Sequence, residues 1–276
     1  MSSLSAEEYF QQGKLDLAMS AAAEQVRDNP DDEQVRTFFV ELLCVKGEYE
    51  RADAQLNALM TLKPDLALAV ATWRQLIHAA QIRSDVYQLK AKPEVIDTPT
   101  DSIKNALDIL VALDEKDEDR ISQLVENIDD DKKVSQFLVN NDGPALLRDL
   151  DDITANIFEL LGTNGKYFWV DFSQVVEIEF SKPTRILDVL WRKANIVLTN
   201  GTEGEVYLPT TYPMLSDDDA ALGKKTEWQQ SFSLYQGIGL KTWLYGDNEL
   251  TINEIDSLKN MAHSTDDAVK NEVAEG

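Results

Sequence analysis

Cysteine and histidine are scarce in this sequence. Cys44 is the single cysteine among 276 residues, so an intramolecular disulfide and a thiolate metal cluster are both excluded. The two histidines are His78 and His263, and the sequence shows no histidine-rich metal site and no Cys–His catalytic pair. Because Cys44 stands in an apolar stretch with Leu42 and Leu43, we expect it to be a small core residue and not a nucleophile.

Basic residues are also few. The chain has 26 Lys and Arg against 50 Asp and Glu, which gives a formal net charge of -24. A field of this sign repels phosphate backbones and anionic lipid headgroups, because both are bound through clustered cations. We therefore expect no nucleic-acid partner. A basic helix or a cationic protein surface is the more suitable partner.

Long apolar runs are missing. No run approaches the roughly 20 residues that a membrane-spanning helix needs, so no membrane insertion is expected. The first residues, MSSLSAEEYFQQGK, lack the basic stretch and apolar core of a secretory signal. Since 43% of the residues are hydrophobic, the chain has enough apolar material for a packed globular protein. These features predict a cytoplasmic protein.

Motifs that carry chemistry are not found. The segment Gly237–Gly239 is too short to be a phosphate-binding loop. The acidic runs Asp129–Asp131 and Asp217–Asp219 lack the alternating spacing and central glycine of a calcium loop, so we interpret them as solvated loop charge. No cofactor, no metal and no catalytic residue is predicted. The chain is therefore expected not to be an enzyme.

A repeat of 34 residues is the strongest positive signal. The segment Gly13–Ala18 is echoed by Gly47–Ala52, and Pro30-Asp31 recurs at Pro64-Asp65 with the same offset. This period, with glycine in a turn, alanine early in the second helix and proline after it, is typical of tetratricopeptide-like repeats. We assign residues 1–92 to a helical repeat domain, closed by a third helix from about Leu66 to Lys90.

Each recurring residue has a physical role in such a repeat. The glycine permits a tight bend between two helices, and the alanine lets the helix backbones approach closely. The proline ends the second helix, and Asp31 or Asp65 is expected to cap the next one. A plain helical bundle without a binding groove is the alternative interpretation.

The rest of the chain is expected to form an α+β domain. Residues 93–161 are assigned to a linker, with two prolines, and to connecting helices: one capped by Thr100 or Asp101, one through Ile128, and a short one from Ile153 to Leu161. Residues 162–260 should form a mainly antiparallel sheet of about five strands, near 166–172, 175–180, 195–199, 205–208 and 241–245. Trp169, Trp191, Trp228 and Trp243 are expected core anchors, with a place on a binding surface as the alternative for one of them. Residues 261–276 are expected to form a disordered polar tail.

Three stretches of the sequence carry a resemblance to a known family. The first is Phe38–Ala52, the second is Asn164–Phe172, and the third includes Asp188–Trp191, Val206–Pro213 and Lys225–Trp228. In this order, the stretches resemble the ImpE family, also called SciE-type virulence proteins, of bacterial type VI secretion loci. The resemblance implies an accessory protein without catalytic residues. It also implies a link to the contractile sheath and to the ClpV-type ATPase that disassembles it.

The repeat and the resemblance together suggest how a partner is held. We hypothesise that the repeat domain accepts an amphipathic N-terminal helix of the small sheath subunit in a groove. The groove residues expected from helical periodicity are Glu7, Phe10, Gln11, Thr37, Glu41, Cys44, Val45, Gln75 and His78. Two alternatives are a homo-oligomeric scaffold that associates through the β half, and an enzyme that uses paired acids of the β half on a carbohydrate or a peptide.

Overall fold

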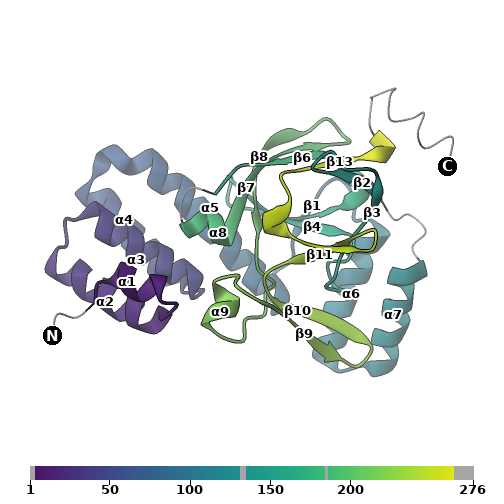
Figure 1. Ribbon diagram of the computed structural model, residues 1–276, viewed down its shortest axis with the longest axis horizontal. Coiled ribbons are helices and arrows are strands. Elements are labelled where there is room, and N and C mark those ends of the chain that lie inside the picture. Colours follow the sequence, from purple (N-terminus) through teal and green to yellow (C-terminus); the bar gives the residue numbers. More distant parts are fainter. Residues whose placement is uncertain (1–3, 131–134, 184–185, 264–276) are drawn as a thin grey trace.

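The computed structural model describes residues 4–130, 135–183 and 186–263. Five helices form the N-terminal part of these residues, on the left of Figure 1: α1 (Ala6–Gln11), α2 (Leu15–Asp28), α3 (Glu33–Val45), α4 (Tyr49–Leu62) and α5 (Ala67–Tyr87). Each helix packs against the next one in the chain. The C-terminal part is a curved sheet flanked by further helices, so the α+β class is confirmed. Most of the expected tail lies outside the described residues.

The 34-residue period corresponds to two equivalent helix–turn–helix units. Gly13 and Gly47 hold the two turns with φ angles of +72° and +70°, a left-handed conformation that favours glycine. Ala18 and Ala52 are completely buried at the matching positions of α2 and α4. The role predicted for the repeated glycine is therefore confirmed, and the repeated alanine is buried.

The predicted capping aspartates are wrong. Asp32, not Asp31, is the N-cap of α3, because its side chain accepts hydrogen bonds from the backbone N–H groups of Gln34 and Val35 at 2.9 and 3.1 Å. Before α5 the chain forms a 3-10 turn over Pro64–Leu66, and no side chain caps the helix that follows. Helix α3 begins at Glu33, so the residue directly before it, Asp32, takes the capping role.

This cap leads to a prediction. Asp32→Ala should lower the free energy of unfolding by about 1 kcal/mol, because it removes the acceptor for two otherwise unpaired N–H groups of α3. Asp31→Ala is the matched control and should change stability by less than about 0.5 kcal/mol. Urea unfolding of both variants measures the difference. A larger loss for Asp31→Ala would contradict this assignment of the cap.

The C-terminal part contains one large sheet and one separate hairpin. The strands of the sheet are β1 (Glu94–Val95), β2 (Gln136–Val139), β3 (Ala145–Asp149), β4 (Ile157–Gly162), β5 (Tyr167–Asp171), β6 (Val175–Phe180), β7 (Trp191–Leu198), β8 (Glu203–Pro209), β11 (Thr242–Tyr245), β12 (Asn248–Thr251) and β13 (Ser257–Asn260). Their order is β1-β5-β4-β8-β7-β6-β13-β2-β3-β11-β12, and all pairs are antiparallel except β1 with β5. The hairpin is β9 (Thr226–Ser231) with β10 (Leu234–Gly239).

Four helices accompany these strands. They are α6 (Asp101–Glu115), α7 (Glu118–Asp130), α8 (Ile186–Leu190) and α9 (Asp218–Ala221). Helices α6 and α7 pack together and flank the sheet, while α8 and α9 lie between the sheet and the N-terminal helices (Figure 1). Of the two predicted candidates, Thr100 and not Asp101 caps α6, by accepting a hydrogen bond from the N–H of Ile103.

Several sheet predictions are confirmed and others are wrong. Strands β5, β6, β7, β8 and β11 lie where the sequence predicted strands. The helix predicted over residues 153–161 is instead a turn followed by β4, whose six residues are all buried. A strand buried on both faces has no alternating pattern, so its apolar run was misread as helical. Five strands were too few, since β1 lies in the predicted linker and β2, β3, β9, β10, β12 and β13 were missed.

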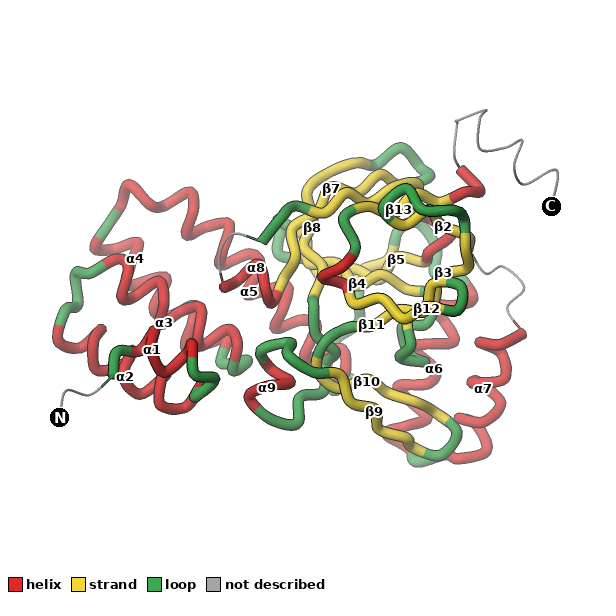
Figure 2. The backbone as a smooth tube through the Cα atoms, in the orientation of Figure 1, coloured by secondary structure: helices red, strands yellow, loops and turns green. Residues whose placement is uncertain are grey.

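The sheet curls around its own apolar core (Figure 2), in which Phe137, Phe158, Phe172 and Trp243 pack edge-to-face or stacked. A second cluster is continuous from Ala6 in α1, through the other N-terminal helices, to residues of the sheet and the hairpin. The helical repeat therefore shares a core with the C-terminal half. Trp169, Trp191 and Trp243 are buried as predicted, whereas Trp228 is 43% exposed and is not a core anchor.

Candidate functional site: the junction between helices and sheet

A buried ion pair joins the last repeat helix to the sheet. Arg83 of α5 donates from Nε and Nη2 to the two carboxylate oxygens of Glu159 in β4, at 2.8 and 3.0 Å. The Arg83 side chain is 12% exposed and that of Glu159 is 1% exposed. Nη2 also donates to the carbonyl oxygen of Thr211 at 2.9 Å. This two-point contact fixes the direction in which α5 crosses the sheet.

A second cation balances the charge of this cluster. The Nζ of Lys241 lies 2.9 Å from an oxygen of Asp149 and 3.0 Å from an oxygen of Glu159, and all three side chains are buried. Together with Arg83, the group contains two cations and two carboxylates. Buried charges are costly unless each one is paired and hydrogen-bonded, so the neutral sum explains how this cluster is tolerated between the two halves.

Aromatic hydroxyl groups complete the cluster. Tyr87 and Tyr167 donate to the Glu159 carboxylate, and Tyr212 donates to Asp149 at 2.8 Å. Burial alone would raise the pKa of Glu159, but the charges of Arg83 and Lys241 outweigh it and hold that pKa well below its ordinary value. Glu159 is therefore charged at neutral pH.

Asp151 is a further buried acid near this cluster. Burial and the neighbouring carboxylate of Asp149 raise the pKa of Asp151 to about 7. Its two oxygens accept backbone hydrogen bonds from Ile153 and Gly237, at 2.9 and 2.8 Å. Asp149 is likewise engaged, by Lys241 and Tyr212. Both acids are held in structural contacts, so this pair adds no support to the alternative of an acid-based enzyme.

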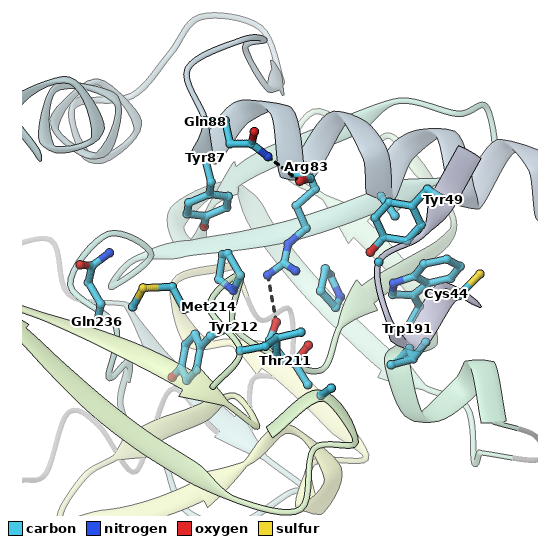
Figure 3. Close-up of a pocket in the computed structure, with 18 of the residues that line it drawn as sticks. Cys44, Tyr49, Arg83, Tyr87, Gln88, Trp191, Thr211, Tyr212, Met214 and Gln236 are labelled. Carbon is cyan, nitrogen blue, oxygen red and sulfur yellow. Dashed lines mark hydrogen bonds between the residues drawn. The ribbon is translucent and has the colours of Figure 1, made fainter. Parts of the chain in front are cut away.

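A pocket opens beside the ion cluster, at the junction of the helices and the sheet. Its volume is about 520 Å³, and we call it the junction pocket. Figure 3 shows residues of α3, α4 and α5 on one side and residues that follow β8 on the other. Residues that define the junction pocket are Cys44, Tyr49, Arg83, Tyr87, Trp191, Thr211, Tyr212, Met214 and Gln236. The rings of Tyr49 and Trp191 are neighbours, with a centroid distance of 6.3 Å and an angle of 35° between their planes.

A second, mostly apolar hollow adjoins this pocket. It has a volume of about 260 Å³ and is lined by Phe10, Gln11, Val45, Ile186, Val189, Leu190, Leu222 and Lys224; we call it the α1–α8 hollow. Val45 and Leu190 line both spaces, so the hollow and the junction pocket are neighbours. Val189 of α8 is 40% exposed at this place. Both spaces lie between the N-terminal helices and the C-terminal half, which we call the inner side of the repeat helices.

The structure divides the predicted groove residues into three groups. Phe10 and Gln11 line the α1–α8 hollow, Cys44 lines the junction pocket, and Val45 lines both. Gln75 and His78 line another hollow, of about 650 Å³, between α4 and α5.

Glu7, Thr37 and Glu41 line none of these three spaces; Glu7 is exposed, Thr37 is half-buried and Glu41 is buried. The groove is interrupted because the chain's own helix α8 packs against α3.

Cys44 and Asp218, two further residues considered in the sequence, lie in the same region. Cys44 is buried, and burial together with the Glu41 carboxylate raises the pKa of its thiol. The thiol therefore stays protonated, which agrees with the interpretation of Cys44 as a core residue. Asp218 is not simply solvated, because it accepts hydrogen bonds from the backbone of Leu15 at 3.3 Å and from Lys46 at 3.2 Å. It therefore ties α9 to the repeat helices. Within the residues that the structure describes, no group of His, Cys, Asp and Glu side chains is arranged to hold a metal ion.

The residues of the ion cluster were not found from the sequence. Arg83 and Glu159 are 76 positions apart, and their pairing has no local signal. Tyr212 and Trp191 stand in stretches already singled out by the family resemblance, which was the one available clue to their importance. In the described part of the chain, no helix is both long and apolar enough to span a bilayer.

Comparison with known proteins supports the resemblance. The family described as ImpE protein matches residues 143–259. The type VI secretion system accessory component TagJ of Pseudomonas aeruginosa is 30% identical over 230 residues, which cover 82% of this chain and 81% of that protein. The chain belongs to the ImpE family. The crystal structure of protein VPA1032 from Vibrio parahaemolyticus has a TM-score of 0.87 at 30% identity, covering 93% of this chain and 97% of that one.

Residues from the first and third of the stretches that carry the ImpE resemblance meet at the junction pocket. Cys44 and Tyr49 come from the first stretch, Trp191 ends another, and Thr211 and Tyr212 belong to the segment after β8. These residues are far apart in the sequence, and the fold brings them to one cavity. The protein is thus a homologue of a type VI secretion accessory component, and parts of two of its family-typical stretches line the pocket between the helices and the sheet.

Proposed function

We propose that this protein is a non-catalytic adaptor of the type VI secretion system. It holds an amphipathic helix of the small sheath subunit and links it to the ClpV-type ATPase that disassembles the sheath. The observation that carries the proposal is the α1–α8 hollow, an apolar space lying on the inner side of the repeat helices. The 30% identity to the accessory component TagJ supports a role in the same machine.

The chemistry of the hollow suits one kind of helix. Phe10, Val189 and Leu222 offer apolar contacts to a stripe of apolar residues on the incoming helix. The nearby cations are already paired, since Lys46 contacts Asp16 and Lys224 contacts Asp219. The net charge of -24 therefore remains the dominant field, and it favours a helix whose flanks are basic.

Binding of a sheath-derived peptide tests the proposal. Val189→Glu should weaken binding of a synthetic peptide from the N-terminal helix of the small sheath subunit by about tenfold or more, because it places a charge in an apolar contact. Val189 is exposed, so the variant should remain folded. Leu68→Glu is the control, since Leu68 is 83% exposed at the start of α5 and lines none of the hollows. Fluorescence anisotropy of the labelled peptide gives both affinities.

Two results would reject this site. One is that Val189→Glu and the unaltered protein bind the peptide with equal affinity. The other is that Leu68→Glu loses more peptide affinity than Val189→Glu. The link to the ATPase is tested separately, by co-purification of the sheath subunit with the ClpV-type ATPase in the presence and absence of this protein. If this protein is the adaptor, the ATPase should co-purify with the sheath subunit only when this protein is also present.

A homo-oligomeric scaffold is the second candidate, and the β9–β10 hairpin favours it. Trp228, Phe232 and Tyr235 are all more than two-fifths exposed on this hairpin. In the described part of the chain β9 pairs only with β10, so its outer edge has free backbone groups. Light scattering of the purified protein separates the candidates, because a scaffold would form a stable oligomer without any partner.

A further inference from the structure

We propose that the junction pocket is a binding site for an uncharged aromatic group that carries a hydrogen-bond acceptor. This proposal goes beyond the adaptor function and does not depend on helix binding. The pocket volume of about 520 Å³ falls in the range of sites that hold small molecules, and it exceeds what a single methyl or isopropyl group would fill. Its walls carry four aromatic residues, Tyr49, Tyr87, Trp191 and Tyr212.

Two donors of the pocket are not used by the protein. Arg83 employs Nε and Nη2 for Glu159 and Thr211, and among the described residues its Nη1 has no hydrogen-bond partner. The Tyr49 hydroxyl has none either within the described part of the chain. Burial raises the pKa of Tyr49 to about 12, so this hydroxyl keeps its proton at neutral pH. Both groups line the pocket, and Figure 3 shows them on the same side of it. They are therefore available to donate to a ligand acceptor.

The charges around the pocket indicate a neutral ligand. The guanidinium of Arg83 is already neutralised by Glu159, and Lys241 is matched by Asp149. Among the described residues that line the pocket, Arg83 is the one cation and it is already paired, so an anion would meet Asp114 on the pocket wall and the net charge of -24. A cation at the Arg83 end would meet a guanidinium that donates hydrogen bonds and cannot accept one. A carbonyl or hydroxyl oxygen on a flat ring fits both the walls and the donors.

A matched set of probes tests this chemistry. Benzamide carries a neutral acceptor, benzoate is anionic, benzylamine is cationic, and toluene has no acceptor. The indole N–H signal of Trp191, assigned with Trp191→Phe, reports binding in ¹H–¹⁵N spectra of the full chain. We expect benzamide to shift this signal until it saturates. The affinities of benzoate and benzylamine should be lower by about tenfold or more.

Variants connect the response to the pocket. Tyr49→Phe should lower the affinity for benzamide by about two- to tenfold and leave the affinity for toluene unchanged, because it removes a hydrogen-bond donor and keeps the ring. Ser84→Phe, which adds a ring at a half-buried lining position, should block all four probes. Thr72→Phe, on the same helix but outside the pocket lining, is the control and should bind benzamide normally.

The source of the natural group is distinguished by competition. Displacement of benzamide by the sheath-helix peptide would show that the pocket receives an aromatic side chain of the partner, whereas simultaneous binding would show a site for a free small molecule. The proposal is overturned if the Trp191 signal does not respond to benzamide, if benzoate binds as tightly as benzamide, or if Tyr49→Phe weakens toluene and benzamide equally.

Discussion

Glu159→Gln is expected to lower the free energy of unfolding by about 3–5 kcal/mol. The substitution keeps the size of the side chain but removes the charge that Arg83 and Lys241 share. Arg83 would then have lost its carboxylate partner and Lys241 one of its two, and an uncompensated buried charge is costly. Urea unfolding followed by tryptophan fluorescence measures the loss, and the midpoint should fall without a change in the slope.

Glu205→Gln is the matched control for this variant. Glu205 forms an ion pair with Lys193 at 2.6 Å, but the two side chains are 38% and 42% exposed. Such a surface pair contributes little, so the expected loss is below about 1 kcal/mol. Similar losses for the two variants would mean that the junction cluster is hydrated and does not hold the helices to the sheet.

Glu159→Gln should also change how the stability of the protein depends on acidic pH. The pKa of Glu159 is lowered in the folded state from its ordinary value of 4.5, so its charge adds stability that is fully present above that value. This contribution is lost as the pH falls below 4.5 towards the folded-state pKa. Glu159→Gln should therefore lose less stability than the unaltered protein between roughly pH 5 and pH 2. Parallel pH profiles would contradict the assigned pKa shift.

Gly239→Ala is expected to lower the free energy of unfolding by about 3 kcal/mol. Gly239 has a φ angle of +84°, and a Cβ atom there would lie 2.3 Å from the backbone oxygen of Lys225. That oxygen cannot move freely, because it accepts the N–H of Leu240 at 2.8 Å. The carbonyl of Gly239 also accepts the N–H of Tyr212 at 2.7 Å, so displacement here would disturb a wall of the junction pocket.

Gly47→Ala separates backbone strain from the steric contact. Gly47 has a φ angle of +70°, similar to that of Gly239, but a Cβ atom there would meet nothing within 4 Å. The expected loss is about 1 kcal/mol, which reflects the left-handed conformation alone. Urea unfolding of both variants gives the comparison. Equal losses would show that the Lys225 backbone yields to the added methyl group.

The repeat and several strands could be predicted because their signals are local. Gly13 and Gly47 mark equivalent turns, and the spacing of apolar residues between them defines the helices. Strand β6 was recognisable from alternation, and β7 with β8 from the loop that joins them. In contrast, β4 is buried on both faces, so its sequence carries no alternation that distinguishes a strand from a helix.

The predicted groove depended on more than local pattern. Phe10, Gln11, Cys44 and Val45 do line spaces on the inner side of the repeat helices. Helical periodicity placed these residues on one face, but it could not show that α8 packs on α3 or that Glu41 is buried there. Contacts between distant segments decide which part of a helix face remains open to a partner.

By itself, the sequence determined the 34-residue helical period, the α+β class, the family and the scarcity of residues for metal or thiol chemistry. Only the tertiary structure decided that Arg83, Glu159, Lys241 and Asp149 form one neutral buried cluster and that a pocket opens beside it. The physical reason is the distance along the chain between the residues that interact. Helix periods, turns and strand alternation are set by neighbours along the chain, whereas charge pairing and cavities arise from residues that folding brings together.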